Sequence, residues 1–361
     1  MSIVLTPRRL GVSAGAAVAY IGPNWFASVM GTGIVATAAS VVPVRHGDLI
    51  PFAVVMWLLA ALLLVAVVLA TAAHWLLHPV VARRHLAHPV MGHFYGAPAM
   101  ALMAVGASTL LVGHHLIGTR AAVTIDLVLW PAGTLAGLWT MWSIPRRTLR
   151  SADGYRGPAF GGWLMPVVPP MVSAATGALL VPHLPASSRS VTILSCYVMF
   201  GVALLASAPF IVTIVRRALS GRIGAAATVP TLFIVLGPLG QSVTAAHLLG
   251  ETSGRAGRAF GLAYGLPVLL CALAWLVAAA VLVVRAARSG LPFGLTWWSF
   301  TFPVGTVVTG SAGLATQTGS PLLDAVAVCL FVVLVAAWAV VAALTIRGVL
   351  TGAVLAPVQT A

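Results

Sequence analysis

Long apolar segments alternate with short polar loops along the whole chain, and these segments are of two kinds. Crossing about 30 Å of hydrocarbon takes about 20 helical residues, and segments of that length recur ten times. Five of them are interrupted by glycine and proline, at 21–43, 91–115, 161–182, 228–249 and 294–317. Each is followed by a smoother segment, at 50–76, 121–144, 190–215, 259–284 and 321–346. This pattern predicts an all-α integral membrane protein with ten transmembrane helices in one domain, residues 1–361.

The alternation also predicts which helices lie inside. A proline within a helix leaves a backbone carbonyl without its donor, and hydrocarbon tolerates this only where protein or a water-filled cavity satisfies the group. We therefore expect five helical hairpins around a central pore, with the interrupted helices innermost. Kinks are expected in these inner helices at Pro98, Pro166, Pro170, Pro238 and Pro303. The alternative is that the glycines only allow close packing, as in the GxxxG spacings at 92–96, 133–137 and 261–265.

Composition excludes a soluble globular protein, because 60% of the residues are hydrophobic and 7% are charged, against a usual charged fraction of about 25%. The formal net charge of +14 would suggest a nucleic-acid partner in a soluble protein, but its distribution indicates membrane sidedness instead. Assigning the loops alternately to two sides places 14 arginines on one side and 5 on the other. The positive-inside rule then predicts a multi-pass protein of the cell membrane, inner or plasma, with both termini in the cytoplasm. The richer side holds Arg8, Arg9, Arg83, Arg84, Arg146, Arg147, Arg150, Arg156, Arg216, Arg217, Arg222, Arg285, Arg288 and Arg347, and the poorer side Arg45, Arg120, Arg189, Arg255 and Arg258.

The stretch WWSFTFPVGT, residues 297–306, separates two phenylalanines by helix face. Phe302 shares one face with the small or polar residues Thr306, Thr309 and Thr316, which follow at helical spacing. Phe300 lies on another face, among valines. Phe302 is therefore a candidate gate, a bulky plug beside a hydroxyl-lined track. From the residues alone, ordinary packing explains Phe302 equally well.

Other inner segments offer similar small and polar faces, which are candidate pore-lining positions. They carry Asn24, Ser28, Thr32, Ser173, Gly237, Gln241 and Thr244. The acidic residues lie instead in loops or near segment ends, where Asp126 is expected to cap a helix or to contact a loop. A neutral corridor with arginines at its mouths suits an anion, whereas proton relays usually use ionisable groups inside the membrane.

Five histidines between residues 74 and 93 are the remaining candidates for chemistry: His74, His78, His85, His88 and His93. His74 and His78 have a spacing that could bind a metal or haem, but no second group of ligands is evident. We therefore expect no metal, no cofactor and no enzyme activity; a membrane enzyme holding a cofactor on these histidines is a distant alternative. His93 enters the third apolar segment and is the titratable candidate facing the corridor. The cysteines Cys196, Cys271 and Cys329 are each isolated and are expected to be core residues.

Three motifs, GPNWFASVMGTGIVA at 22–36, GPLGQ at 237–241 and WWSFTFPVGT at 297–306, resemble the tellurite-resistance and dicarboxylate transporter family. This family includes bacterial tellurite-resistance channels, slow-type anion channels of plants, malate permeases and sulfite efflux pumps. The resemblance covers nearly the whole chain. It implies five hairpins around a pore in each protomer, a homotrimer, and a phenylalanine gate for which Phe302 is the matching position.

The function expected from residues and resemblance together is a conduit for small anions, such as chloride, nitrate, sulfite or C4-dicarboxylates. The alternative is a proton-coupled transporter of malate or sulfite, in which His93 would handle the proton. The expected partners are therefore these anions, the lipid bilayer and further copies of the chain.

Overall fold

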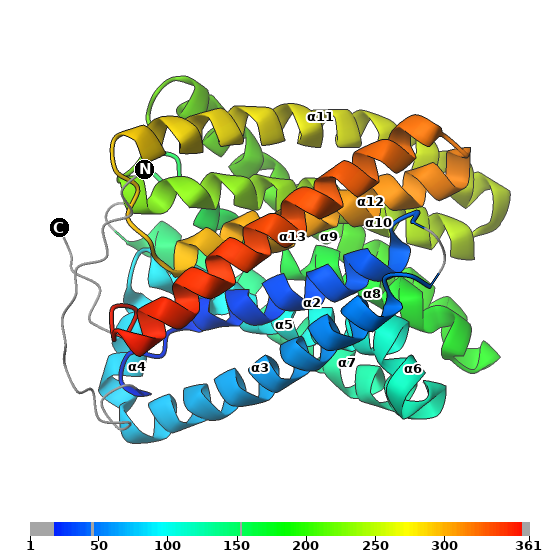
Figure 1. Ribbon diagram of the computed structural model, residues 1–361, viewed down its shortest axis with the longest axis horizontal. Coiled ribbons are helices and arrows are strands. Elements are labelled where there is room, and N and C mark those ends of the chain that lie inside the picture. Colours follow the sequence, from blue (N-terminus) through cyan, green and yellow to red (C-terminus); the bar gives the residue numbers. More distant parts are fainter. Residues whose placement is uncertain (1–17, 45–46, 152–153, 356–361) are drawn as a thin grey trace.

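The computed structural model describes residues 18–44, 47–151 and 154–355, which fold into helices joined by short loops. Five α-helices form the inner layer: α2 (Phe26–Val41), α5 (Gly96–Ser108), α8 (Pro169–Leu180), α10 (Leu236–Thr252) and α12 (Phe302–Thr318). Five longer helices form the outer layer: α3 (Ile50–Leu77), α7 (Thr119–Arg150), α9 (Ala186–Leu219), α11 (Gly254–Arg288) and α13 (Pro321–Leu350). Figure 1 shows them lying side by side, and a short α4 (Pro79–Ala87) follows α3.

The inner helices close into a ring. Each contacts the next in chain order, α2 with α5, α5 with α8, α8 with α10 and α10 with α12, and α12 contacts α2 again. Each outer helix packs on the inner helix before it and on the one after it, so that α3 bridges α2 and α5, and α13 bridges α12 and α2. The result is a fivefold arrangement of helical hairpins, which matches the predicted alternation of inner and outer segments.

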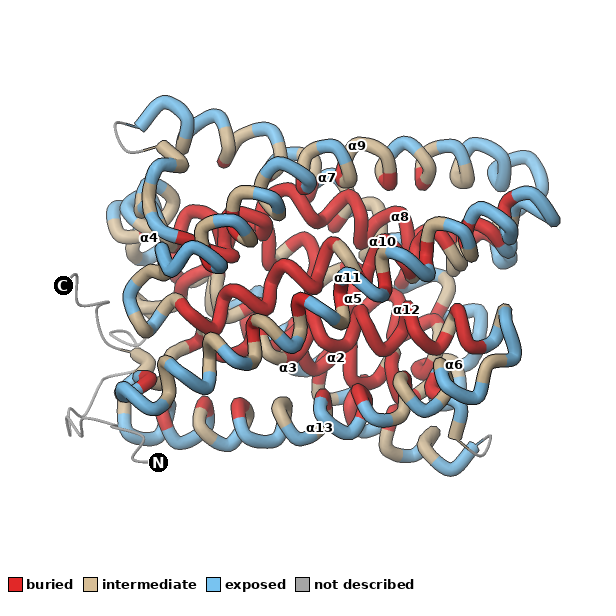
Figure 2. The backbone as a smooth tube through the Cα atoms, turned by 90° about the horizontal axis from the view of Figure 1, so that it is seen from above, coloured by how far each residue is buried: buried red, intermediate tan, exposed pale blue. Residues whose placement is uncertain are grey.

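Burial separates the two layers in the same way. In the most apolar windows of the outer helices, 22–33% of residues are buried, against 67% in the span containing α5 and 78% in the span containing α10. Figure 2 shows the buried backbone gathered in the middle, with α9 and α13 mostly intermediate or exposed on opposite sides. The exposed residues of the outer helices include many leucines and valines, which is the surface expected against lipid acyl chains.

Every inner helix begins with a 3₁₀ segment: Pro23–Trp25, Met91–Tyr95, Gly161–Leu164, Ala226–Val235 and Leu295–Phe300. The prolines predicted to kink these helices lie at or near this change of geometry. Pro170 and Pro303 lie at the first two positions of α8 and α12, Pro98 and Pro238 are third in α5 and α10, and Pro166 precedes α8. These prolines thus lie close to the change from 3₁₀ to α-helical geometry, and the kinks themselves stay a prediction.

Seven helices of the described part are long and apolar enough to cross a membrane. The inner helices α5 and α10 reach this length only together with their adjoining segments, as Met91–Ile117 and Ala226–Thr252. The helices α2, α8 and α12 have 16, 12 and 17 residues and do not reach it. Ten crossings therefore remain a prediction. The outer helices extend past the predicted limits, as in α9, which begins at Ala186 and ends at Leu219, because arginine-bearing turns continue the helix beyond the apolar stretch.

The glycine spacings contribute to packing as well. A Cβ on Gly133 would lie 2.8 Å from the carbonyl oxygen of Ala99, and one on Gly261 would lie 2.9 Å from that of Ala246. Outer helices thus approach the inner ring at glycines, as the alternative explanation proposed. Among the cysteines, Cys196 is buried as expected, but Cys271 and Cys329 are exposed on outer helices, so the prediction that all three are core residues is wrong.

The described arginines are divided between the two ends of the bundle. The last turns of α7, α9, α11 and α13 carry arginines, including Arg150, Arg217, Arg288 and Arg347. The inner helices α8, α10 and α12 begin at this same end, because each follows an outer helix through a short connection. Arg120, Arg189, Arg255 and Arg258 lie near the opposite ends of the outer helices. Arg8, Arg9 and Arg45 lie outside the described residues.

Candidate functional site

The inner ring encloses a cavity of about 160 Å³ that is lined by all five inner helices. Its lining is mainly aliphatic, with polar groups contributed chiefly by α10 and α12. The first lining residues along each helix are Ile34, Ala104, Val172, Gln241 and Phe302, and the last are Val41, Leu111, Leu179, Leu248 and Thr316. The cavity therefore follows the axis of the ring from the level of Phe302 toward the C-terminal ends of the inner helices.

At the C-terminal ends of the inner helices, which we call the outer end of the cavity, lies a second hollow of about 310 Å³ beneath the loop between α2 and α3. The two share Val41 and Thr316. The cavity therefore ends next to a hollow at the rim of the bundle.

Phe302 lies at the deep end of the cavity and is 3% exposed. It is the first residue of α12, directly after the 3₁₀ segment and the bend at Thr301. The next α12 residue on the cavity is Thr309, two turns farther on. The ring of Phe302 is thus the innermost bulky group that α12 contributes to the axis.

Gly237 was predicted to line the pore, but it is not part of the lining of the central cavity. It lies one turn before Gly240 on α10, where a Cβ at Gly240 would be 2.6 Å from the hydroxyl of Thr306 on α12. Gly237 is buried, yet a Cβ there would meet no atom within 4 Å. Free space therefore exists beside the start of α10.

The predicted pore-lining residues Gln241, Thr244, Thr309 and Thr316 lie on the cavity. The hydroxyls of Thr309 and Thr316 donate to backbone carbonyls of their own helix, those of Thr306 and Ala312. Thr244 lies 2.8 Å from Thr309, hydroxyl to hydroxyl, and 3.2 Å from the carbonyl oxygen of Gly240. Gln241 is 5% exposed, and its amide makes no hydrogen bond to the described residues.

Other predicted pore-lining residues face elsewhere, and these predictions are corrected. Thr32 accepts a hydrogen bond from the indole of Trp338 on α13, and Ser173 is hydrogen-bonded to Thr134 on α7. Both therefore point to outer helices. Thr306 donates to the carbonyls of Pro303 and Leu236 and fills the contact between α12 and α10.

Two more predicted residues lie below the cavity, near the start of α2. Ser28 donates to the carbonyl of Trp25. The side-chain oxygen of Asn24 is buried beside Gly22 and has no hydrogen-bond partner among the described residues. Neither residue lines the cavity that reaches Phe302.

Phe300, two residues before Phe302, has aromatic neighbours instead of a cavity. Its ring makes edge contacts with Phe233, at 4.9 Å between centroids, and with Trp297, at 5.8 Å. The structure thus separates the two phenylalanines, one on the axis and one in a packed cluster.

His93 does not face the central cavity, which corrects its predicted position. It lines a separate hollow of about 800 Å³ at the arginine-rich end, together with Arg147 and Trp163. Its Nδ1 lies 2.8 Å from the carbonyl oxygen of Pro89, and its ring makes edge contacts with Tyr155 and Phe160. Burial raises the pKa of Tyr155, which lies in the loop over this hollow.

The other histidines of the cluster gather at the same end. The rings of His74 and His85 stack with centroids 5.2 Å apart. Burial, with His74 and His88 nearby, lowers the pKa of His85, so the ring of His85 is expected to be uncharged near neutral pH. Across the described ranges, no three histidine, cysteine or acidic side chains are grouped so as to hold a metal.

Asp126 is buried within α7 instead of capping a helix, so that prediction is wrong. It packs against Gly106 of α5. Both of its carboxyl oxygens lack a hydrogen-bond partner in the described part of the chain.

Sequence reasoning missed His247, which lines the outer part of the central cavity. It lies two turns after Gln241 on α10, and Gly313 of α12 leaves room for its ring, since a Cβ there would lie 2.5 Å from the ring carbon Cδ2. The spacing from Thr244 to His247 was a signal for one helix face.

Comparison with known proteins identifies the family to which this chain is similar. The family model described as voltage-dependent anion channel matches residues 20–346, nearly the whole chain. The chain belongs to the voltage-dependent anion channel family. This confirms the resemblance stated from the three motifs, and the chain is accordingly a multi-pass membrane protein that serves as an anion channel or transporter.

Individual relatives are distant but align over most of their length. A sulfite efflux pump of Arthroderma otae is 26% identical over 346 residues, covering 91% of both chains. One of Trichophyton rubrum is 24% identical over 342 residues, again covering 91% of each. An uncharacterized transporter of Methanocaldococcus jannaschii is 24% identical over 334 residues, covering 92% of this chain and 94% of its own.

Proposed function

We propose that the central cavity of this family member is the pathway of a small inorganic anion across the membrane, with sulfite as the first substrate to test. The observation that carries the proposal is the closed ring of five helices around a cavity that ends at Phe302. The cavity lining holds no acidic residue among the described side chains, so no fixed negative charge repels an anion there. The relatives named sulfite efflux pumps support the choice of sulfite.

The lining of the cavity favours a small inorganic anion over a C4-dicarboxylate. A dicarboxylate carries two separated charges and would need two sites of positive potential. The described lining holds no arginine or lysine to supply them.

Phe302 is proposed to close this pathway. A phenyl ring offers no hydrogen bond to an anion, so in a narrow passage it removes hydration without replacing it, and constrictions of this kind gate by dewetting.

A proton-coupled transporter is the second candidate, and His247 on the cavity is the observation that favours it.

Ring-forming helices and exposed apolar outer faces are compatible with the homotrimer that the resemblance implies. The arginine distribution supports the orientation with both termini in the cytoplasm. A role as an enzyme has no support in the family or in the cavity lining.

Flux measurements on purified protein in liposomes test the proposal. Chloride, nitrate, sulfite, malate and succinate are compared at equal gradients, with protein-free liposomes as the control. We expect the inorganic anions to cross and the two dicarboxylates to cross more slowly. Transport of malate and succinate alone would overturn the choice of substrate, and the absence of any anion flux in wild type and Phe302→Ala would overturn the pathway itself.

A further inference from the structure

Hydrogen-bond donors are scarce in the central cavity. The hydroxyls of Thr37, Thr176 and Thr316 donate to carbonyls of their own helices, and Thr309 does the same while paired with Thr244. These threonines present mainly oxygen lone pairs to the cavity, and lone pairs repel an anion. The hydroxyl track is therefore a poorer anion site than its composition suggests.

Two side chains on α10 remain able to donate. Gln241 carries an amide without a partner among the described residues. His247 carries a ring whose buried Nδ1 has no hydrogen-bond partner there, while the side chain of Gln317 on α12 lies within hydrogen-bonding reach of the ring. Both line the cavity, and six residues of helix separate them by about 9 Å along the axis. An anion moving outward from Phe302 meets the amide first and the imidazole second.

His247 is also the one titratable side chain among the described residues of the cavity lining. The described segments α2, α5, α8 and α12 around it contain no acidic or basic residue. On α10 itself Glu251 lies one turn nearer the rim. From α11 come Arg255, Arg258 and Tyr264, and from α9 comes Tyr197. The two tyrosine hydroxyls are held by Ser242 and Ser253.

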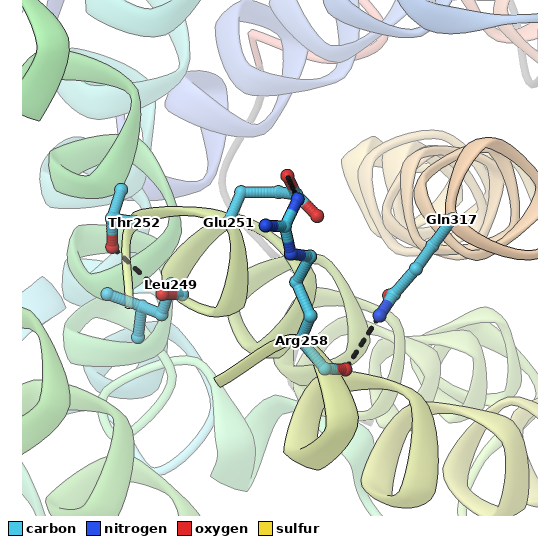
Figure 3. A network of polar contacts seen from close by, with 5 residues as sticks. All are labelled: Leu249, Glu251, Thr252, Arg258 and Gln317. Carbon is cyan, nitrogen blue, oxygen red and sulfur yellow. Dashed lines mark hydrogen bonds and ion pairs between the residues drawn. The ribbon is translucent and has the colours of Figure 1, made fainter. Parts of the chain in front are cut away.

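The charged side chains Glu251 and Arg258 at the rim pair with each other. Glu251 and Arg258 form an ion pair at 3.4 Å, with both side chains substantially exposed. Figure 3 shows this pair at the α10–α11 junction, with Gln317 of α12 donating to the backbone carbonyl of Arg258 at 2.6 Å. The acid near His247 is thus partly neutralised and lies outside the cavity, so a proton on His247 would carry the only positive charge inside it.

We propose that Gln241 and His247 form an anion-binding site in the outer half of the cavity, and that His247 binds a proton from the outer compartment together with the anion. The proton adds to an unprotonated ring nitrogen, which then donates a hydrogen bond to the anion. This inference rests on the proposed pathway and refines it.

The preferred substrate class follows from charge balance. One imidazolium cancels one negative charge, and a buried ion pair is tolerated only when its charges are matched and hydrogen-bonded. The site therefore favours monoanions, such as chloride, nitrate or singly protonated sulfite, over dianions. Because histidine changes charge between about pH 5 and about pH 8, anion flux rises as the outer medium is acidified.

The test uses full-length protein in liposomes, with chloride as the probe and the pH varied only in the compartment facing the α10–α11 rim. Chloride has no protonation of its own in this range, so any pH dependence belongs to the protein. We expect wild-type flux to rise several-fold, and at most about tenfold per pH unit for a single proton, between about pH 8 and about pH 5. His247→Gln is expected to lose this dependence.

His93→Gln is the matched control, since it makes the same change in a histidine outside the cavity and should keep the wild-type pH profile. Gly313→Ala is a second variant, because its methyl group would displace the ring of His247; it should flatten the profile even if His247→Gln fails to assemble. Chloride flux that is independent of pH in wild type, or a profile retained in both cavity variants, would overturn the inference while leaving the pathway intact. Absence of chloride, nitrate and sulfite flux at every pH would instead overturn the pathway.

Discussion

Phe302 combines a position on the axis with a place at the very start of a helix. Pro303 fixes the following backbone, and the bend at Thr301 precedes it. The side chain therefore reaches the cavity from the point where the 3₁₀ segment passes into α12. A blocking role depends on this ring and on no other aromatic side chain of the cavity lining in the described region.

Phe302→Ala is expected to increase anion flux several-fold in liposomes, because it removes the apolar constriction and leaves the packed helices in place. Phe300→Ala is its control. That change removes edge contacts to Phe233 and Trp297 and should lower the melting temperature in detergent without raising the flux. An increase in flux with Phe300→Ala alone would mean that the two faces have been assigned wrongly.

Gln241→Leu is expected to reduce anion flux by about tenfold or more, since a hydrogen bond to a charged partner contributes about 1.5–3 kcal/mol. Thr306→Val serves as the comparison, because the Thr306 hydroxyl bonds to the carbonyls of Pro303 and Leu236 outside the cavity. It should cost about 1 kcal/mol of stability and leave flux near wild type. Equal flux in wild type and Gln241→Leu would exclude the amide from the pathway.

For single residues, the sequence predicted the separation of Phe302 from Phe300 and the inward position of Gln241, because helical spacing determines which residues of a helix share a face. It did not predict which face of α2 or α8 points inward. Thr32 and Ser173 are satisfied by Trp338 and Thr134 of outer helices. The rotation of a helix that is apolar all round depends on such partners, which pattern alone does not reveal.

The inner helices share one design, a 3₁₀ start that passes into an α-helix near a proline. Their parallel starts lie at the arginine-rich end, and their glycines let neighbouring backbones approach. Alternating composition predicted which elements form this layer. It did not predict the 3₁₀ segments. Proline lacks a backbone N–H donor both where it begins a helix and where it kinks one, so the residue alone does not distinguish the two cases.

Two glycines of α10 provide a test of this layer. Gly240→Ala is expected to destabilise the protein by about 1–3 kcal/mol through overpacking, since its methyl group would lie 2.6 Å from the backbone nitrogen of Val307. Gly237→Ala has open space around it and should melt at or above the wild-type temperature. Thermal unfolding in detergent measures both. A lower melting temperature for Gly237→Ala than for Gly240→Ala would show that the free space lies elsewhere.

For the whole molecule, the ring of inner helices and the lipid-facing outer layer were predictable from the alternation of broken and smooth segments. The closure of the ring by α12 against α2 was not, because it joins segments almost 300 residues apart. The cavity likewise emerges only when five faces meet. His247 was missed for this reason, since its significance depends on its neighbours across the axis.

The arginine distribution predicts that both termini face the cytoplasm. A reporter that is active only in the cytoplasm should function when fused to the C-terminus and should fail when fused after Asp48, in the first loop on the opposite side. Activity of the two fusions in the reverse pattern would contradict the orientation. Activity at both positions would contradict the crossing of the first hairpin.

The continuity of the inner ring has a mechanical consequence. A carrier that alternates access rocks one rigid half against another about a fixed site, and this motion needs a boundary between the two halves. Here every inner helix contacts two neighbouring inner helices and packs against outer helices, so no plane divides the bundle into two rigid halves. Opening by the rotation of one aromatic side chain requires no such boundary, and side-chain rotations are far faster than domain motions. Turnover would then be limited by the dehydration of the ion rather than by the movement of the protein.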